Sequence, residues 1–190
     1  MRNVILLSLS FLLMSCIKQD LDSLVNSIAN ENRIECKYIG FGGSPSSQYE
    51  KFEKLKKQAS KEELIELLNH DSLAVVGYSS YALIYKRILE TDKLFDKFIN
   101  QKKTVSTFCG CIIGKDEIAY LIYDRYWQEQ IEHEDAVEFE NFKINDTQQL
   151  RKMDSIILFS RNPDAFLFSR AFSNRIYSDN YHDKIYEWAF

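Results

Sequence analysis

The chain has 190 residues, of which 45% are apolar and 27% charged, and its formal net charge is −4. This length and apolar content suffice for one folded domain with a proper core. The acidic balance lacks the basic surface that nucleic acids require, so a nucleic-acid-binding role is excluded.

The N-terminal residues have the pattern of an export signal. One Arg precedes an apolar run from Val4 to Met14. The run is too short to cross a bilayer core of about 30 Å, which needs roughly twenty residues. It is typical of the apolar region of a signal peptide. The run ends in Leu13-Met14-Ser15-Cys16, with an aliphatic residue three before the Cys and a small residue directly before it.

This ending resembles the lipobox of bacterial lipoproteins. The resemblance implies that residues 1–15 are a signal peptide that is cleaved off, and that Cys16 is the lipidated first residue of the mature chain. It also implies a membrane-anchored protein of the bacterial cell envelope, with the outer membrane and its periplasmic or surface face favoured. The alternative is an ordinary buried or disulfide-bonded Cys behind a signal peptide.

Residues 16–48 are expected to form the lipidated N-terminus, a short helix and a linker. Apolar residues at helical spacing predict the helix: Leu21, Leu24, Val25 and Ile28. The stretch Gly40–Ser47 is rich in Gly and Ser. It lacks the Lys-Ser/Thr pair that closes a phosphate-binding loop, so a linker is predicted and no cofactor.

A helical domain is predicted over residues 49–190. Its first helix covers residues 49–59, and two short helices follow as a hairpin. Ser60 and Glu63 have capping-box spacing at the start of the first of these. Residues 69–72 (Asn-His-Asp-Ser) predict a turn. The second helix of the pair should run from Leu73 to about Arg87.

The second helix resembles that of the HEAT-like α-helical repeats, in which Val, Ala and Leu recur after an Asp-containing turn. The matching residues are Val75, Val76, Ser79, Ala82 and Leu83, after Asp71. A shift of thirty positions places Val75 on Val105 and Ser79 on Cys109, which suggests a second repeat. The resemblance implies an all-α fold, a short right-handed superhelix of stacked antiparallel helix pairs with helical caps. The alternative is that two unrelated helices align at this offset by chance.

Further helices are predicted downstream from apolar periodicity and capping residues. They should carry Ile118 to Trp127, Leu150 to Ile157, Ala165 to Ile176, and Tyr181 to Trp188. Asp146 and Gln149 have capping-box spacing before the second of these.

The cysteines other than Cys16 are Cys36, Cys109 and Cys111, an odd number for an exported protein. Cys109 and Cys111 could ligate a metal, but no second Cys/His pair stands at zinc-site spacing. Buried free thiols are therefore the favoured interpretation.

An acidic run at residues 132–135 (Glu-His-Glu-Asp) is the closest approach to a metal site. It lacks the glycine and ligand spacing of a calcium-binding loop, so a solvated loop is favoured. Neither His70-Asp71 nor His182-Asp183 can act as a catalytic pair, because neighbouring side chains do not face each other. The sequence thus assigns no catalytic, cofactor-binding or metal-binding residue.

Two functions remain open. The favoured one is a lipid-anchored envelope protein, not an enzyme, whose helical repeats bind a protein or peptide partner. The alternative is a lipid-anchored, metal-dependent envelope enzyme that uses the acidic loop around His133.

Overall fold

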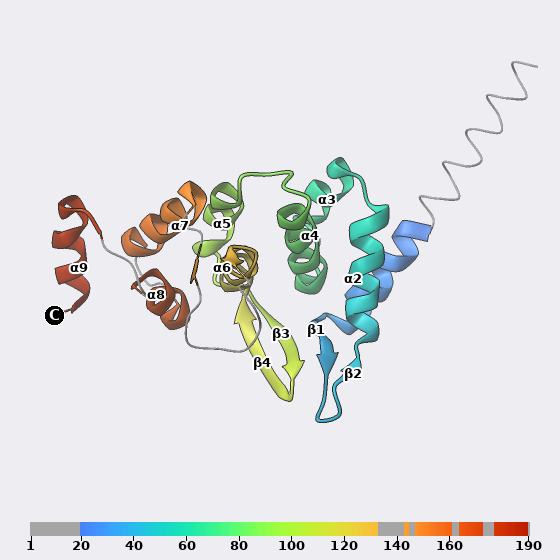
Figure 1. Cartoon of the computed structure of the whole chain (residues 1–190). Helices are drawn as coiled ribbons and strands as arrows, with labels where there is room; N and C mark the ends of the chain where they lie inside the picture. The colour runs from blue at the N-terminus through green and yellow to red at the C-terminus, as the bar shows by residue number, and fades with distance from the viewer. Residues whose placement is uncertain (1–19, 133–142, 145–146, 161–163, 173–176, 190) are drawn as a thin grey trace, which may run out of the picture. The chain divides into compact units, whose positions relative to one another are not determined.

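The structure is a computed structural model that describes residues 20–132, 143–144, 147–160, 164–172 and 177–189 (Figure 1). After a helix over residues 20–31, the elements in chain order are β1 (Arg33–Ile39), β2 (Ser44–Pro45), α2 (Ser47–Gln58), α3 (Lys61–Leu67), α4 (Leu73–Tyr85), α5 (Thr91–Ile99), β3 (Thr104–Gly110), β4 (Ile112–Glu117), α6 (Ile118–Gln128), β5 (Ile131–Glu132), β6 (Lys143–Ile144), α7 (Gln148–Phe159), α8 (Ala165–Phe172), a 3₁₀ turn (Asp179–Tyr181) and α9 (His182–Ala189).

The chain divides into two compact units, and neither is continuous in sequence. Unit 1 contains residues 1–82 and 105–115, and unit 2 contains residues 83–104 and 116–190. Each unit is described separately below.

Unit 1 contains a mixed sheet with the strand order β2-β1-β3-β4. β1 pairs antiparallel with β2 and parallel with β3. The predicted all-α superhelix is therefore wrong, because the molecule combines helices with this four-stranded sheet.

The predicted second HEAT-like repeat is wrong. Only its first helix is present in the structure. α5 is a helix, as the thirty-residue alignment requires, but the following residues form β3 and β4 instead of a second helix. Thr104, Val105 and Thr107 are β-branched and favour strands. The alignment matched apolar residues with apolar residues and did not distinguish a period of two from one of 3.6.

The helical hairpin itself is confirmed. The Ser60 hydroxyl accepts from the Glu63 N–H, and the Glu63 carboxylate accepts from the Ser60 N–H, which completes the predicted capping box. α4 begins at Leu73, directly after the predicted turn. Leu64 and Leu83 are fully buried. The predicted helix over residues 49–59 is α2, which Ser46 caps by accepting from the Tyr49 N–H.

Aromatic side chains form the centre of the unit 1 core. The Phe52 and Tyr78 rings are stacked with their centroids 5.0 Å apart, and Tyr81 meets Phe52 edge-on at 6.0 Å. Phe52 and Tyr78 are completely buried. These contacts join α2 to α4.

Unit 2 is built on α5, α6 and α7. The Tyr123 ring lies 6.0 Å from that of Phe95, and its hydroxyl donates to the buried Asp154 carboxylate at 2.6 Å. Thr147 caps α7 by accepting from the Leu150 N–H, in place of the predicted Asp146, which lies outside the described residues. Within the described residues, no helix combines the length and apolarity needed to cross a bilayer.

Candidate functional site

Two hairpin turns lie side by side at one end of the unit 1 sheet. Because β1 and β3 are parallel, the β1–β2 turn and the β3–β4 turn emerge at the same end. The Gly40 N–H donates to the Gly110 carbonyl at 2.7 Å and so connects them. Gly43 closes the first turn by donating to the Gly40 carbonyl at 3.1 Å. Figure 1 shows this end of β1 and β2 extending away from the helices of the unit.

Large apolar side chains are exposed at both turns. Phe41 is fully exposed, and Ile112 and Ile113 are 76% and 69% exposed. Tyr38 and the thiol of Cys111 are exposed beside them. We call these five residues the sheet tip. A group of exposed large apolar residues is unusual on a monomer and typically marks an interaction surface.

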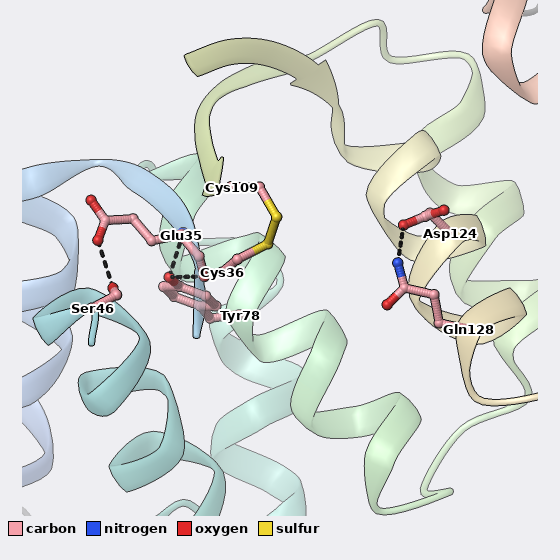
Figure 2. Close-up of a disulfide and its surroundings, with 7 residues drawn as sticks. All are labelled: Glu35, Cys36, Ser46, Tyr78, Cys109, Asp124 and Gln128. Carbon is pink, nitrogen blue, oxygen red and sulfur yellow. Dashed lines mark hydrogen bonds between the residues drawn. A yellow bond between two sulfur atoms is a disulfide. The ribbon is translucent and has the colours of Figure 1, made fainter. Parts of the chain in front are cut away.

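A disulfide between Cys36 of β1 and Cys109 of β3 cross-links the two hairpins behind the tip (Figure 2). The Cα atoms of the two residues are 4.8 Å apart. The prediction of buried free thiols at Cys109 and Cys111 is therefore wrong, since Cys109 is paired and Cys111 is free but exposed. The cross-link holds the two turns in a fixed relation.

A buried polar network supports β1 next to the disulfide. Two groups bind the buried Glu35 carboxylate: Arg33 as an ion pair, and Ser46, whose hydroxyl donates at 2.6 Å. The Tyr78 hydroxyl accepts from the Glu35 N–H at 2.8 Å and donates to the Glu35 carbonyl at 3.3 Å (Figure 2). Glu35 of β1 therefore contacts both the N-cap residue of α2 and a side chain of α4.

The Tyr78 phenol is held in its neutral form. Burial raises its pKa far above the ordinary value of 10.0, and the nearby Glu35 carboxylate adds to this, although the backbone hydrogen bond with Glu35 acts in the opposite direction. A neutral phenol can donate to the Glu35 carbonyl, which a phenolate could not do. The network therefore serves as a structural support for β1 beside the disulfide.

A groove of about 570 Å³ lies beside the β1–β2 hairpin. Its apolar wall contains Tyr38, Pro45 and Tyr49, and its charged rim contains Lys37, Glu50, Glu53 and Lys54. Tyr38 belongs to both the groove and the sheet tip.

Unit 2 contains a separate charged cluster on α6 and α8. Gln128 donates to the Asp124 carboxylate at 2.6 Å, a bond drawn in Figure 2, and Arg170 lies 3.5 Å from the same group. The Arg170 guanidinium stacks on Trp127 at 4.0 Å. Burial raises the pKa of Asp124 above its ordinary value, while Arg170 and Gln128 lower it. The cluster joins two helices and leaves Asp124 fully partnered.

Among the described residues, those singled out in the sequence do not come together in one site. Cys16 and residues 133–135 lie outside the described residues. His70 accepts from the Ser72 N–H at 2.9 Å and so stabilises the turn before α4. No group of three or more His, Cys, Asp or Glu side chains in the described part of the chain could hold a metal ion.

Sequence reasoning missed the sheet tip, although one signal pointed to it. Phe41 interrupts a run of glycines, where a large apolar residue has no packing role. Residues 40–47, expected to be a linker, contain the β1–β2 turn, β2 and the N-cap of α2. The thirty-residue shift also aligns Ile112 with Ala82 and Ile113 with Leu83, so the repeat resemblance placed both isoleucines in a helix.

No known protein family, curated protein or solved structure matches the chain. The function is therefore argued from the chemistry of the residues themselves.

Proposed function

We propose that the protein is a lipid-anchored component of the bacterial cell envelope, tethered through Cys16, that binds a protein or peptide partner with its sheet tip. The single observation that carries the binding role is the exposure of Phe41, Ile112 and Ile113 on two cross-linked turns. The lipobox-like ending at Cys16 supports the anchor. A disulfide also fits an exported protein, since cytosolic proteins seldom keep one.

Within unit 1, the sheet and Asp20 lie at opposite ends of α2. The helix over residues 20–31 runs antiparallel to α2, because Gln58 at the end of α2 contacts Asp20 and Gln48 at its start contacts the Ile28 carbonyl. The twelve residues of α2 span about 18 Å. β2 leads directly into the start of α2, so the sheet lies at that end of the helix. Asp20 lies at the other end.

This arrangement favours a partner protein over the protein's own membrane. Only three residues separate Cys16 from Asp20, so the lipid attachment lies within about 14 Å of the first helix. The tip lies at the end of unit 1 opposite Asp20, where a partner protein can approach it. The adjoining groove, with aromatic and proline walls and charged residues of both signs, suits an extended peptide segment.

Cys16→Ser is expected to abolish membrane anchoring, because acylation requires a thiol at this position. The variant should remain unprocessed and carry no lipid, as checked by mass spectrometry and by labelling of cells with a fatty-acid analogue. A variant with Cys111→Ser is the matched control and should be acylated normally. Acylated Cys16→Ser protein would rule out the lipoprotein assignment.

The combined variant Phe41→Ser, Ile112→Ser, Ile113→Ser is expected to lose its partner while keeping its fold. Exposed substitutions usually change the free energy of unfolding by less than about 0.5 kcal/mol each. A photo-reactive residue at Tyr38 should cross-link a partner in envelope preparations of the parent protein and fail to do so in the variant.

The matched control replaces exposed aromatic residues of unit 2, Phe159→Ser and Tyr186→Ser. This variant should cross-link as the parent does. Equal cross-linking by the tip variant and the parent would refute the docking role of the sheet tip, as would a partner lost equally in both variants.

A further inference from the structure

Three cysteines lie at the sheet tip or directly behind it, and two of them form a disulfide. Cys36 and Cys109 are bonded, and Cys111 is a free, exposed thiol only two residues beyond Cys109. Cys109 is itself exposed, so solvent and a nearby thiol can approach its sulfur. A thiolate with access to a disulfide sulfur is the arrangement that thiol–disulfide exchange requires.

We propose that Cys111 exchanges with the Cys36–Cys109 disulfide, so that the tip interconverts between two cysteine pairings. The Cys111 thiolate attacks the Cys109 sulfur, a Cys109–Cys111 bond forms, and the Cys36–Cys109 bond breaks. Cys36 leaves as a thiolate and takes up the proton that Cys111 has lost. The number of disulfides is unchanged, so no oxidant or reductant is consumed. This exchange does not depend on the proposed docking function.

The backbone between the two cysteines permits the local pairing. Gly110 has φ +54°, in the left-handed region, so the chain bends between Cys109 and Cys111. In a fully extended chain, Cα atoms two residues apart are separated by at most about 7 Å, and a bend brings them into the span of roughly 4.4–6.8 Å that a disulfide bridges. Gly110 has no side chain, and no atom other than those of its two chain neighbours lies within 4 Å of where its Cβ would stand, so the space beside this bend is open.

The two pairings differ in what they connect. The Cys36–Cys109 bond joins β1 to β3 across 73 positions of sequence. The Cys109–Cys111 bond would close only the β3–β4 turn. Exchange would therefore release the covalent connection between the two hairpins and leave their strand pairing to hold them together.

The exchange can be trapped in the full-length protein with limiting iodoacetamide, followed by acid quenching, digestion without reduction and mass spectrometry. A molecule with alkylated Cys36 and a Cys109–Cys111 disulfide is expected in the parent protein. This species should disappear completely in Cys111→Ser, where Cys36 has no partner for exchange. If the parent is alkylated at Cys111 alone throughout the time course, the proposal is wrong.

A second variant tests the local pairing directly. In Cys36→Ser, treatment with oxidised glutathione should produce the Cys109–Cys111 disulfide and leave no alkylatable thiol at either position. The double variant Cys36→Ser, Cys111→Ser is the control and should retain glutathione on Cys109. Stable glutathione adducts on both cysteines of Cys36→Ser would show that the turn cannot close, and would overturn the proposal.

Discussion

Replacing Cys36 and Cys109 together by Ala is expected to lower the free energy of unfolding by about 4 kcal/mol. The disulfide joins residues 73 apart, and a cross-link over so long a loop removes much conformational entropy from the unfolded chain. The loss is a large share of the 5–15 kcal/mol that is typical of a whole domain. Urea unfolding followed by circular dichroism measures it.

The matched control is Cys111→Ala, which removes an exposed free thiol and should leave the midpoint of urea unfolding unchanged. The parent protein in the presence of a reductant should unfold like the double variant. If the double variant and the oxidised parent share one midpoint, the Cys36–Cys109 bond does not stabilise the native protein.

Phe52→Ala is expected to cost about 3–5 kcal/mol, because it leaves a cavity where the largest aromatic cluster of unit 1 meets. The ring is completely buried, and it contacts Tyr78 by stacking and Tyr81 edge-on. Its loss also removes the packing that holds the Tyr78 hydroxyl against Glu35. Thermal unfolding monitored by near-ultraviolet circular dichroism should show both the lower midpoint and the altered tyrosine signal.

Phe41→Ala is the matched control, because it makes the same substitution at a phenylalanine that is exposed instead of buried. Its ring is fully exposed, so the same truncation should change the free energy of unfolding by less than about 0.5 kcal/mol. Similar effects of the two substitutions would contradict the arrangement of Phe52 in the core and Phe41 at the tip.

Local signals in the sequence predicted the helices well. Ser60 and Glu63 form reciprocal hydrogen bonds between the side chain of one and the backbone N–H of the other, so their spacing is sufficient to locate the start of α3. The polar turn before Leu73 acts in the same way, since its side chains satisfy nearby backbone groups. These features depend on residues a few positions apart.

The sheet depends on partners far apart in sequence, and no local pattern specifies them. β1 pairs with β3, about seventy residues later, and neither strand shows a clean alternation of buried and exposed residues. A glutamate such as Glu35 is expected on the surface. In the structure it is buried, and Arg33 and Ser46 bind its carboxylate. The β-branched residues at the start of β3 favoured a strand, but the sequence showed no partner strand that would have excluded the repeat alignment.

The candidate site could not be predicted in full either, because its residues are also far apart in sequence. Three cysteines allow three possible single disulfides, and sequence alone cannot choose among them. Phe41 and Ile112 come together only because the parallel pairing of β1 and β3 puts both turns at one end. Only the lipobox-like ending at Cys16 could be recognised without the fold.

The discontinuous units also determine when the protein can finish folding as it is made. A ribosome delivers the N-terminal end first, so β1 and α4 emerge well before β3 and β4. Until residues 105–115 arrive, β1 has an unpaired edge and Cys36 has no partner. During that interval the nascent chain presents an open strand that another chain could occupy. Assistance at this stage, or fast synthesis of residues 83–104, would shorten the exposure.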